Sequence, residues 1–292
     1  MTEGTGKIDL HCHTKASDNT MTVNEVLSAA VAAGISHLAI TDHDTTLGVQ
    51  EAMELGERVG ITIIPGIEIS AYDYERGRRA HILGYYIQPG HPALARLCGP
   101  IVEQRHQASF RMVQRLVEAG YRLSWEQVLG YAQGGSCVYK QHIMHALVDS
   151  GQSPELFGVL YKQLFSRSDE QERTGSALVP LKYVDAVEAI RAIRDAGGVA
   201  VLAHPGQLHN YEAIEGWAAA GLEGIEALHP SHNRAEEQKA RWYAEQYGLV
   251  ATGGSDFHGG YGNAAYPLGC IDAGTECLHA LEERRLSRRE AR

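Results

Sequence analysis

The sequence has few cysteines, no long apolar run and no excess of basic residues, and each lack excludes a class of protein. Its five cysteines are odd in number and widely spaced, without a C-x-x-C pair, so neither a disulfide framework nor a thiolate zinc site is indicated. No apolar run approaches the roughly 20 residues of a membrane span. These lacks favour a reducing, cytoplasmic location without a membrane partner.

Acidic residues outnumber basic ones. The 292 residues include 26 Lys and Arg against 36 Asp and Glu, a formal net charge of −10, which argues against binding long nucleic acid. Hydrophobic residues make up 44%, enough for a sizeable core. Histidine is abundant, with 15 residues, several of which stand beside Asp or Pro at the ends of apolar runs. This pattern points to metal binding.

Short apolar runs alternate with amphipathic stretches along most of the chain, as is typical of βα units. Strands are predicted at residues 7–11, 37–41, 61–67, 81–87, 199–203, 224–228 and 249–253. Helices are predicted at residues 22–33, 47–59, 184–196, 211–220 and 235–247. Seven strands with intervening helices predict an α/β fold, a distorted (β/α)7 barrel.

One block breaks the alternation. Residues 92–180 show helical patterns at 94–119, 124–132, 141–149 and 154–165 and no convincing strand. We therefore expect a barrel built from residues 1–91 and 181–292, with residues 92–180 as a helical insertion over the barrel mouth that carries the C-terminal strand ends. There it would cap the substrate.

The predicted strands repeatedly end in side chains that can ligate a metal. In a parallel barrel the C-terminal strand ends share one face, and residues i and i+2 of an extended segment point the same way. His11 with His13, and Asp256 with His258, can therefore each project two ligands into one cavity. His81 instead stands at a strand start, so it requires either a reversed strand or a loop that reaches the mouth.

The sequence resembles the PHP (polymerase and histidinol phosphatase) family of metal-dependent phosphoesterases, and within it the stand-alone nucleotide-type phosphatases. The motifs that carry this resemblance span nearly the whole chain: I-D-L-H-C-H-T at 8–14, S-D at 17–18, T-D-H-D at 41–44, G-I-E at 66–68, L-A-H-P at 202–205 and G-S-D-F-H at 254–258.

The resemblance implies a centre of two or three divalent cations, which are manganese, iron or zinc in the family. One cation would be held by His11, His13, Glu68 and Asp256. A second would be held by Glu68, His81 and His204, and a third by Asp18, His43 and His258. Mixed imidazole and carboxylate ligation suits all three metals and does not choose among them.

Substrate contacts are predicted at four further residues: Lys140, His142, His229 and His232. Related phosphatases have an arginine-proline-histidine segment in the insertion, whereas this chain has Lys140-Gln141-His142, which loses the bidentate fork of arginine. His229 closes the sixth strand, with His232 close behind it, and could bind phosphate or act as a general acid.

These patterns predict an enzyme, a metal-dependent phosphatase that hydrolyses a small phosphomonoester by metal-activated hydroxide attack. The expected substrate is nucleotide-like, such as a nucleoside 5′-monophosphate or a 3′,5′-bisphosphate. Three divalent cations, three carboxylates and one hydroxide leave a charge of about +2, which matches a phosphomonoester dianion, whereas two cations leave about +1, which suits a diester.

Three alternatives remain open at this point. The same metals could serve a cyclic phosphodiesterase or a short-oligonucleotide exonuclease. An amidohydrolase-type enzyme also uses an H-x-H pair and a late Asp in a metal barrel. The chain could also be a non-catalytic metal-binding module, although such modules usually lose ligands. The oligomeric state is not indicated by the sequence.

Overall fold

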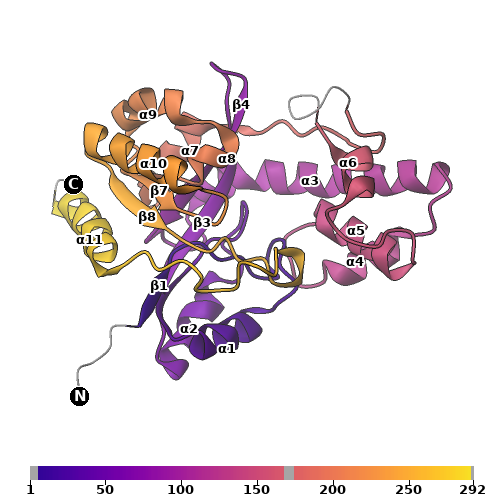
Figure 1. Cartoon of the computed structure of the whole chain (residues 1–292), viewed down its shortest axis with the longest axis horizontal. Helices are drawn as coiled ribbons and strands as arrows, with labels where there is room; N and C mark the ends of the chain where they lie inside the picture. The colour runs from indigo at the N-terminus through magenta and orange to yellow at the C-terminus, as the bar shows by residue number, and fades with distance from the viewer. Residues whose placement is uncertain (1–5, 168–173, 291–292) are drawn as a thin grey trace. The chain divides into compact units, whose positions relative to one another are not determined.

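The computed structural model describes residues 6–167 and 174–290, and the chain divides into two compact units. Unit 1 consists of Met1–Gly99 and Tyr183–Arg292, and unit 2 of Pro100–Lys182. The expected insertion, residues 92–180, overlaps unit 2 except at its first eight residues, which belong to unit 1. Figure 1 shows the order of the elements along the chain.

An eight-stranded sheet forms the centre of unit 1 among the described residues. Its strands are β1 (Lys7–Asp9), β2 (Ile35–Ile40), β3 (Thr62–Asp73), β4 (Arg78–Tyr85), β5 (Val184–Asp185), β6 (Val199–Leu202), β7 (Gly224–Leu228) and β8 (Val250–Gly253). The order is β1-β2-β3-β4-β6-β7-β8, and the two-residue β5 pairs with β3. The predicted α/β fold on seven strands is thus confirmed, with β5 as a short addition.

One strand runs against the others. β4 is antiparallel to both of its neighbours, β3 and β6, while the remaining pairs are parallel. A tight hairpin joins β3 to β4, with Asp73 opposite Arg78. The reversal places the first residues of β4 at the end of the sheet where the parallel strands finish.

The edge strands β1 and β8 are not paired as strands, but backbone hydrogen bonds join these two edges of the sheet. The Leu10 N–H donates to the Gly253 carbonyl at 3.3 Å, and the His13 N–H donates to the Phe257 carbonyl at 3.0 Å. Cys12 and Phe257 form a parallel bridge between these bonds. The sheet is therefore a distorted barrel whose seam is closed by segments beyond the strands.

Helices of unit 1 pack against the sheet (Figure 1). They are α1 (Val23–Ala32), α2 (Val49–Val59), α7 (Ala186–Asp195), α8 (Pro205–Leu208), α9 (Ile214–Ala220), α10 (Arg234–Tyr247) and α11 (Thr275–Glu290), with short 3₁₀ turns at Tyr211–Ala213 and Gly259–Tyr261. Local signals set several boundaries. A capping box between Thr22 and Glu25 begins α1, and Gly60, with a φ of 77°, ends α2.

The alternation of strand side chains separates two layers of the core. Ile67 and Ile69 of β3 pack outward against α7 and α9, whereas Ile64 belongs to an inner cluster with Leu83 and Tyr85 of β4. Residues of α11 complete the inner cluster: Cys277, Leu278 and Leu281. Glu68 has the same parity as Ile64, so it also points to the inner side of the sheet.

Unit 2 is a small helical body with a core of its own. Its helices are α3 (Pro92–Glu118), which starts in unit 1, followed by α4 (Trp125–Tyr131), α5 (Lys140–Asp149) and α6 (Val159–Phe165). The helix expected at 154–165 begins only at Val159. No helix in the described part of the chain is long and apolar enough to cross a membrane.

We predict that Asp9→Asn destabilises the barrel seam. The buried Asp9 carboxylate accepts the backbone N–H groups of His11, Ser255 and Gly269 at 3.3, 2.9 and 2.9 Å. An asparagine turns one of these oxygens into an NH₂ group that faces an N–H, so the free energy of unfolding should fall by about 2 kcal/mol or more. Urea unfolding followed by circular dichroism measures the change.

Asp272→Asn is the matched control. The Asp272 carboxylate is exposed and accepts the N–H of Ile8 at 3.1 Å through one oxygen only, which asparagine retains. We expect a change within about 0.5 kcal/mol. Equal losses for the two variants would contradict the role given to Asp9.

Candidate metal centre

Glu68 is a buried carboxylate in the middle of β3, with 1% of its surface exposed. Backbone bonds fix its position against the segment after β2: the Asp44 N–H donates to the Glu68 carbonyl at 2.9 Å, and the Glu68 N–H donates to the Asp42 carbonyl at 3.2 Å. This pairing places His43 beside Glu68, in a parallel bridge.

Five imidazole rings converge on the Glu68 carboxylate from different elements. Oε2 lies 3.4, 3.2 and 3.1 Å from ring nitrogens of His11, His13 and His43. Oε1 lies 2.8 and 3.1 Å from ring nitrogens of His81 and His204. Each oxygen thus faces its own group of histidines, which is the geometry of a carboxylate able to bridge two cations.

The H-x-H and D-F-H motifs lie side by side, because Cys12 pairs with Phe257. Cys12 is fully buried in the core against α1 and α2, so the residues flanking the bridge point the other way, into the cluster. Asp256 Oδ1 accordingly lies 3.3 Å from His11 Nε2 and 3.2 Å from His13 Nε2. The i, i+2 spacing within each motif predicts that its two ligands point the same way, and the pairing of the two motifs follows from the seam of the barrel.

The position of His81 follows from the reversal of β4. His81 pairs with Ser70, two residues beyond Glu68 on the neighbouring strand, so both side chains stand on the same face of the hairpin. Of the two options that the sequence left open for His81, the reversed strand is the one present.

A turn between residues 14 and 18 brings Asp18 to the cluster. Asp18 Oδ1 lies 3.6 Å from His13 Nδ1 and 3.5 Å from His258 Nε2. The turn is held by Asp42, whose carboxylate accepts the N–H and hydroxyl groups of Thr14 and Ser17 at 2.6–3.1 Å.

Glu226 is a residue that the motifs do not reveal. It is fully buried in β7, accepts from His11 Nδ1 at 3.0 Å and accepts the backbone N–H of His204 at 2.8 Å. The first bond places the proton of His11 on Nδ1 and leaves Nε2 to face Glu68 and Asp256. A lone Glu inside a buried apolar strand, I-E-A-L, is the only sequence signal for it.

The backbone is strained at two of these positions. His204 has a φ of 25° and Asp256 a φ of 51°, a region that residues other than glycine rarely occupy. The His204 N–H bond to Glu226 holds one of these turns in place. Such strain directs each side chain into the cluster rather than along its strand.

The residues fit a set of metal sites. Two ligands that share a cation at about 2.1 Å lie roughly 3.0–3.4 Å apart, which is the spacing found around Glu68. Groups of nearby ligand atoms are His11, His13, Glu68 and Asp256; His13, Asp18, His43 and His258; and His43, Glu68 and His81. Among the described residues, the buried Nε2 atoms of His11 and His13 have no hydrogen-bond partner, as expected of ligand atoms.

The protonation states show how strongly the carboxylates attract positive charge. Burial acts to lower the pKa of His13, but Asp256 and Glu68 outweigh it and raise that pKa to about 10. Burial lowers the pKa of His43 to about 4, which keeps this ring neutral. The pKa of Glu68 lies well below its usual range, because its electrostatic interactions with the surrounding imidazoles, those of His43 and His81 being the largest, outweigh burial.

Comparison with known proteins agrees with this geometry. The PHP domain matches residues 9–152. A curated protein of Eggerthella lenta, phosphoribosyl 1,2-cyclic phosphate 1,2-diphosphodiesterase, is 44% identical over 258 residues, which cover 88% of this chain and 96% of the relative. The chain belongs to the PHP family.

Two further PHP-type relatives cover most of the chain. The 3′,5′-nucleoside bisphosphate phosphatase of Chromobacterium violaceum is 34% identical over 86% of this chain and 87% of the relative. A solved structure described as a metal-dependent phosphoesterase of Bifidobacterium adolescentis is 28% identical, with a TM-score of 0.85 over 96% of this chain and 97% of that one. This chain is accordingly a metal-dependent phosphoesterase of the PHP family. The names of the two curated relatives favour this activity over the amidohydrolase and non-catalytic alternatives.

His229 and His232 follow β7 in this PHP barrel but differ in their surroundings. His229 Nε2 lies 3.3 Å from Asp256 Oδ2, at the edge of the cluster, and its Nδ1 accepts the Ser231 N–H at 3.0 Å. His232 uses both ring nitrogens for backbone bonds: Nδ1 donates to the Ala227 carbonyl, and Nε2 accepts the Gly206 N–H. His229 therefore borders the cluster, whereas His232 holds two loops together.

Lys140 and His142 lie at the start of α5 in unit 2. Lys140 Nζ stands 5.4 Å from the centre of the Tyr161 ring, and His142 is buried with Nδ1 accepting the Tyr139 N–H. Arg105 lies near them, since its guanidinium is 4.8 Å from the centre of the Tyr139 ring and is 8% exposed. Unit 2 thus contains a buried guanidinium that the Lys-Gln-His segment itself lacks.

We predict that Glu226→Gln weakens metal binding. The glutamine keeps the size of the side chain but cannot hold the His11 proton as a carboxylate does, so metal affinity should fall about tenfold to a hundredfold. Titration of the metal-free protein with manganese, followed by calorimetry, measures this affinity directly.

Glu223→Gln is the control, because Glu223 immediately precedes β7, pairs with Arg288 and contacts no residue of the cluster. We expect its manganese affinity to equal that of the unmodified protein. If Glu226→Gln bound manganese as tightly as the unmodified protein, the Glu226 carboxylate would not be needed to position His11 for the metal.

Proposed function

We propose that this phosphoesterase hydrolyses a small phosphomonoester of a ribose-containing, nucleotide-like molecule at a centre of three divalent cations. The proposed ligands are the nine residues predicted from the sequence: His11, His13, Asp18, His43, Glu68, His81, His204, Asp256 and His258. The observation that carries the proposal is the Glu68 carboxylate, whose two oxygens face separate groups of histidines. Manganese, iron and zinc suit this donor set, and we propose a cytoplasmic location.

Bound cations would supply a water of lowered pKa and would neutralise the phosphoryl oxygens. The chain itself holds the ligands in place before substrate arrives. Glu226 sets the proton of His11 on Nδ1, and Asp42 fixes the turn that carries Asp18. Most of the cluster is buried, with Glu68 and the rings of His11 and His13 almost fully enclosed, so bulk water is excluded from these groups.

His229 is the proposed proton donor to the leaving group. Its Nδ1 accepts the Ser231 N–H, which places the ring proton on Nε2, and Nε2 faces Asp256. A proton is therefore held at an atom that borders the cluster, where the alkoxide of a phosphate ester requires protonation.

Substrate contacts in unit 2 are proposed at Lys140 and His142, as expected from the sequence. Lys140 would supply one compact positive charge. His232 was also expected to contact substrate, and its two backbone bonds favour a positioning role instead. Unit 2 remains the proposed substrate cap.

A cyclic phosphodiester is the second candidate substrate, and two observations favour it. The relative at 44% identity is named for a cyclic phosphate. Glu226, which is fully buried, also adds a fourth carboxylate to the cluster, which lowers the expected charge of a three-cation centre from about +2 to about +1, the charge that matches a diester monoanion.

We predict that the manganese-loaded protein releases phosphate from 5′-AMP and from a 3′,5′-bisphosphate, and that Glu68→Ala abolishes this. Loss of the central carboxylate removes a ligand from both groups of histidines, so metal content and turnover should fall together, turnover by about 10³-fold or more. Phosphate release and metal content are measured on the same samples.

The same panel includes a cyclic phosphodiester and a dinucleotide. Hydrolysis of the cyclic diester alone would replace the monoester proposal with the second candidate, and cleavage of the dinucleotide alone would indicate an exonuclease. If the metal-loaded protein hydrolysed none of these compounds, both candidate substrates would be refuted. Full turnover in Glu68→Ala would refute the site.

We predict that His229→Gln slows hydrolysis according to the leaving group. Without the Nε2 proton, an alkyl phosphate such as 5′-AMP should lose about 10²-fold or more in kcat, because its leaving group requires protonation. An aryl phosphate such as p-nitrophenyl phosphate should lose less than about tenfold. Steady-state kinetics on the two substrates separates the effects.

Ser231→Ala serves as the comparison, since it removes the hydroxyl at 2.7 Å from His229 Nδ1 but retains the Ser231 N–H bond. We expect a smaller loss with the same dependence on the leaving group. Equal losses of both substrates in His229→Gln would assign His229 to metal or phosphate binding.

A further inference from the structure

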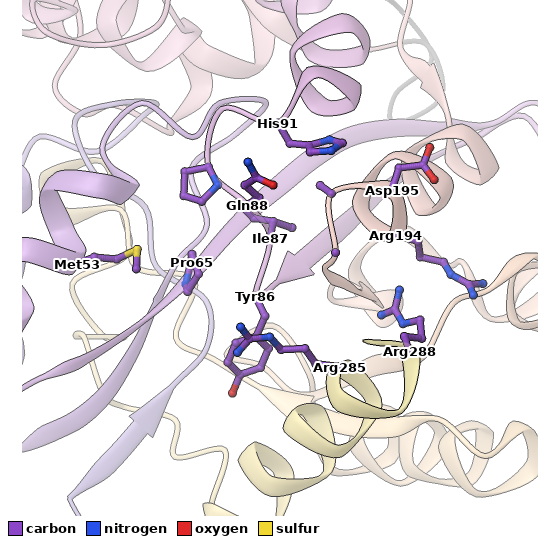
Figure 2. A pocket seen from close by; sticks show the side chains of 13 residues that line it. Met53, Pro65, Tyr86, Ile87, Gln88, His91, Arg194, Asp195, Arg285 and Arg288 are labelled. Carbon is purple, nitrogen blue, oxygen red and sulfur yellow. The ribbon is translucent and has the colours of Figure 1, made fainter. Parts of the chain in front are cut away.

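Unit 1 contains a cavity away from the histidine cluster. It measures about 550 Å³ and is lined by Met53, Pro65, Tyr86, Ile87, Gln88, Pro89, His91, Arg194, Asp195, Ala196, Gly197, Arg285 and Arg288. Figure 2 shows three arginine side chains along one side of this cavity and the apolar Met53, Pro65 and Ile87 toward the other.

The cavity lies at the opposite end of the sheet from the cluster. Pro65 precedes Glu68 near the start of β3, and Tyr86 follows the last residue of the reversed β4, whereas His81 stands near its beginning. Gly197 likewise comes before β6, while His204 comes after it. The two sites are therefore separated by three residues along β3, from Pro65 to Glu68, and by five residues from His81 to Tyr86.

Arg285 is the cation of this cavity that is least engaged by the protein. Its guanidinium lies 5.1 Å from the centre of the Tyr86 ring (Figure 2), which fixes its place without using its N–H groups. Within residues 6–167 and 174–290 it has neither a hydrogen-bond nor an ion-pair partner. Five donors are thus held at the cavity wall and remain available to an anion.

The other two arginines are held by the protein. Arg288 donates to the Gly198 carbonyl at 2.5 Å and pairs with Glu223 at 2.6 Å. Arg194 also acts electrostatically on Glu223. Asp195 is the single carboxylate among the lining residues and Glu223 stands behind Arg288, so three guanidinium groups against two carboxylates leave this wall with one excess positive charge.

We propose that this cavity binds a small organic phosphate at a site separate from the metal centre. Its phosphate would pair with Arg285, since a planar guanidinium can bind two phosphate oxygens, and Arg194 and Arg288 would add positive charge nearby. Its less polar part would lie against Met53, Pro65 and Ile87, and the cavity volume accommodates a molecule of nucleotide size. The proposal does not depend on the identity of the hydrolysed substrate.

The test uses the full chain in its metal-free form, so that AMP is not hydrolysed, and calorimetry with 5′-AMP as the probe. We expect saturable binding with one site, and a loss of affinity of about tenfold or more in Arg285→Gln, because a charge-assisted contact is removed. Arg284→Gln is the matched control. Arg284 is the adjacent arginine of α11 but is exposed, donates to the Gly248 carbonyl and does not line the cavity.

Two further probes separate the parts of the ligand. Adenosine, which lacks the phosphate, should bind at least tenfold more weakly than AMP, and inorganic phosphate, which lacks the apolar part, should also bind more weakly. Manganese-dependent turnover of Arg285→Gln should equal that of Arg284→Gln, which excludes loss of the fold.

The outcomes decide the proposal. AMP affinity lost in Arg285→Gln and retained in Arg284→Gln supports it. Equal affinities in the two variants would overturn it, because the anion would then bind elsewhere, including at the histidine cluster. Absence of saturable binding, or equal binding of adenosine and AMP, would also overturn it. If inorganic phosphate bound as tightly as AMP, Met53, Pro65 and Ile87 would contribute nothing to binding, and that part of the proposal would be wrong.

Discussion

The Glu68 carboxylate is the constraint on which the centre depends. A carboxylate with 1% exposure is costly to bury unless positive charge or donors surround it, and five imidazole rings from four segments of the chain do so. The strands must end where those rings can reach Glu68. The twist of the barrel, the seam at Cys12 and the reversal of β4 all serve this convergence.

Sequence patterns predicted most of this arrangement because its signals are local. Apolar runs located the seven main strands within a few residues, and the period of two placed His11 with His13 and Asp256 with His258. The family resemblance supplied the grouping of ligands, and the barrel matches that expectation. The direction of β4 was left open, because a strand's direction depends on its partners rather than on its own composition.

What the sequence did not reveal depends on tertiary contacts. Glu226 stands in an apolar strand without a motif, and its bonds to His11 and His204 exist only after β1, β6 and β7 are assembled. Asp42 belongs to the T-D-H-D motif, but its role as the acceptor that braces the turn before Asp18 depends on Thr14 and Ser17, which lie far from it in the sequence. The two-residue β5 was hidden within a predicted helix, since it is too short to have a period. The anionic ligand proposed at Arg285 rests on residues from α2, β3, α7 and α11, which no single motif unites.

The hairpin of β3 and β4 has a consequence for how the protein reaches its native state. Glu68 and His81 are 13 positions apart in the sequence, and an eight-pair antiparallel ladder from Gly66–Tyr85 to Asp73–Arg78 holds them together. Closing so short a loop costs little chain entropy, whereas joining His11 to Asp256 must enclose more than two hundred residues. The hairpin is therefore the segment expected to form early during synthesis, carrying a carboxylate and an imidazole already in place while the rest of the barrel is still unmade.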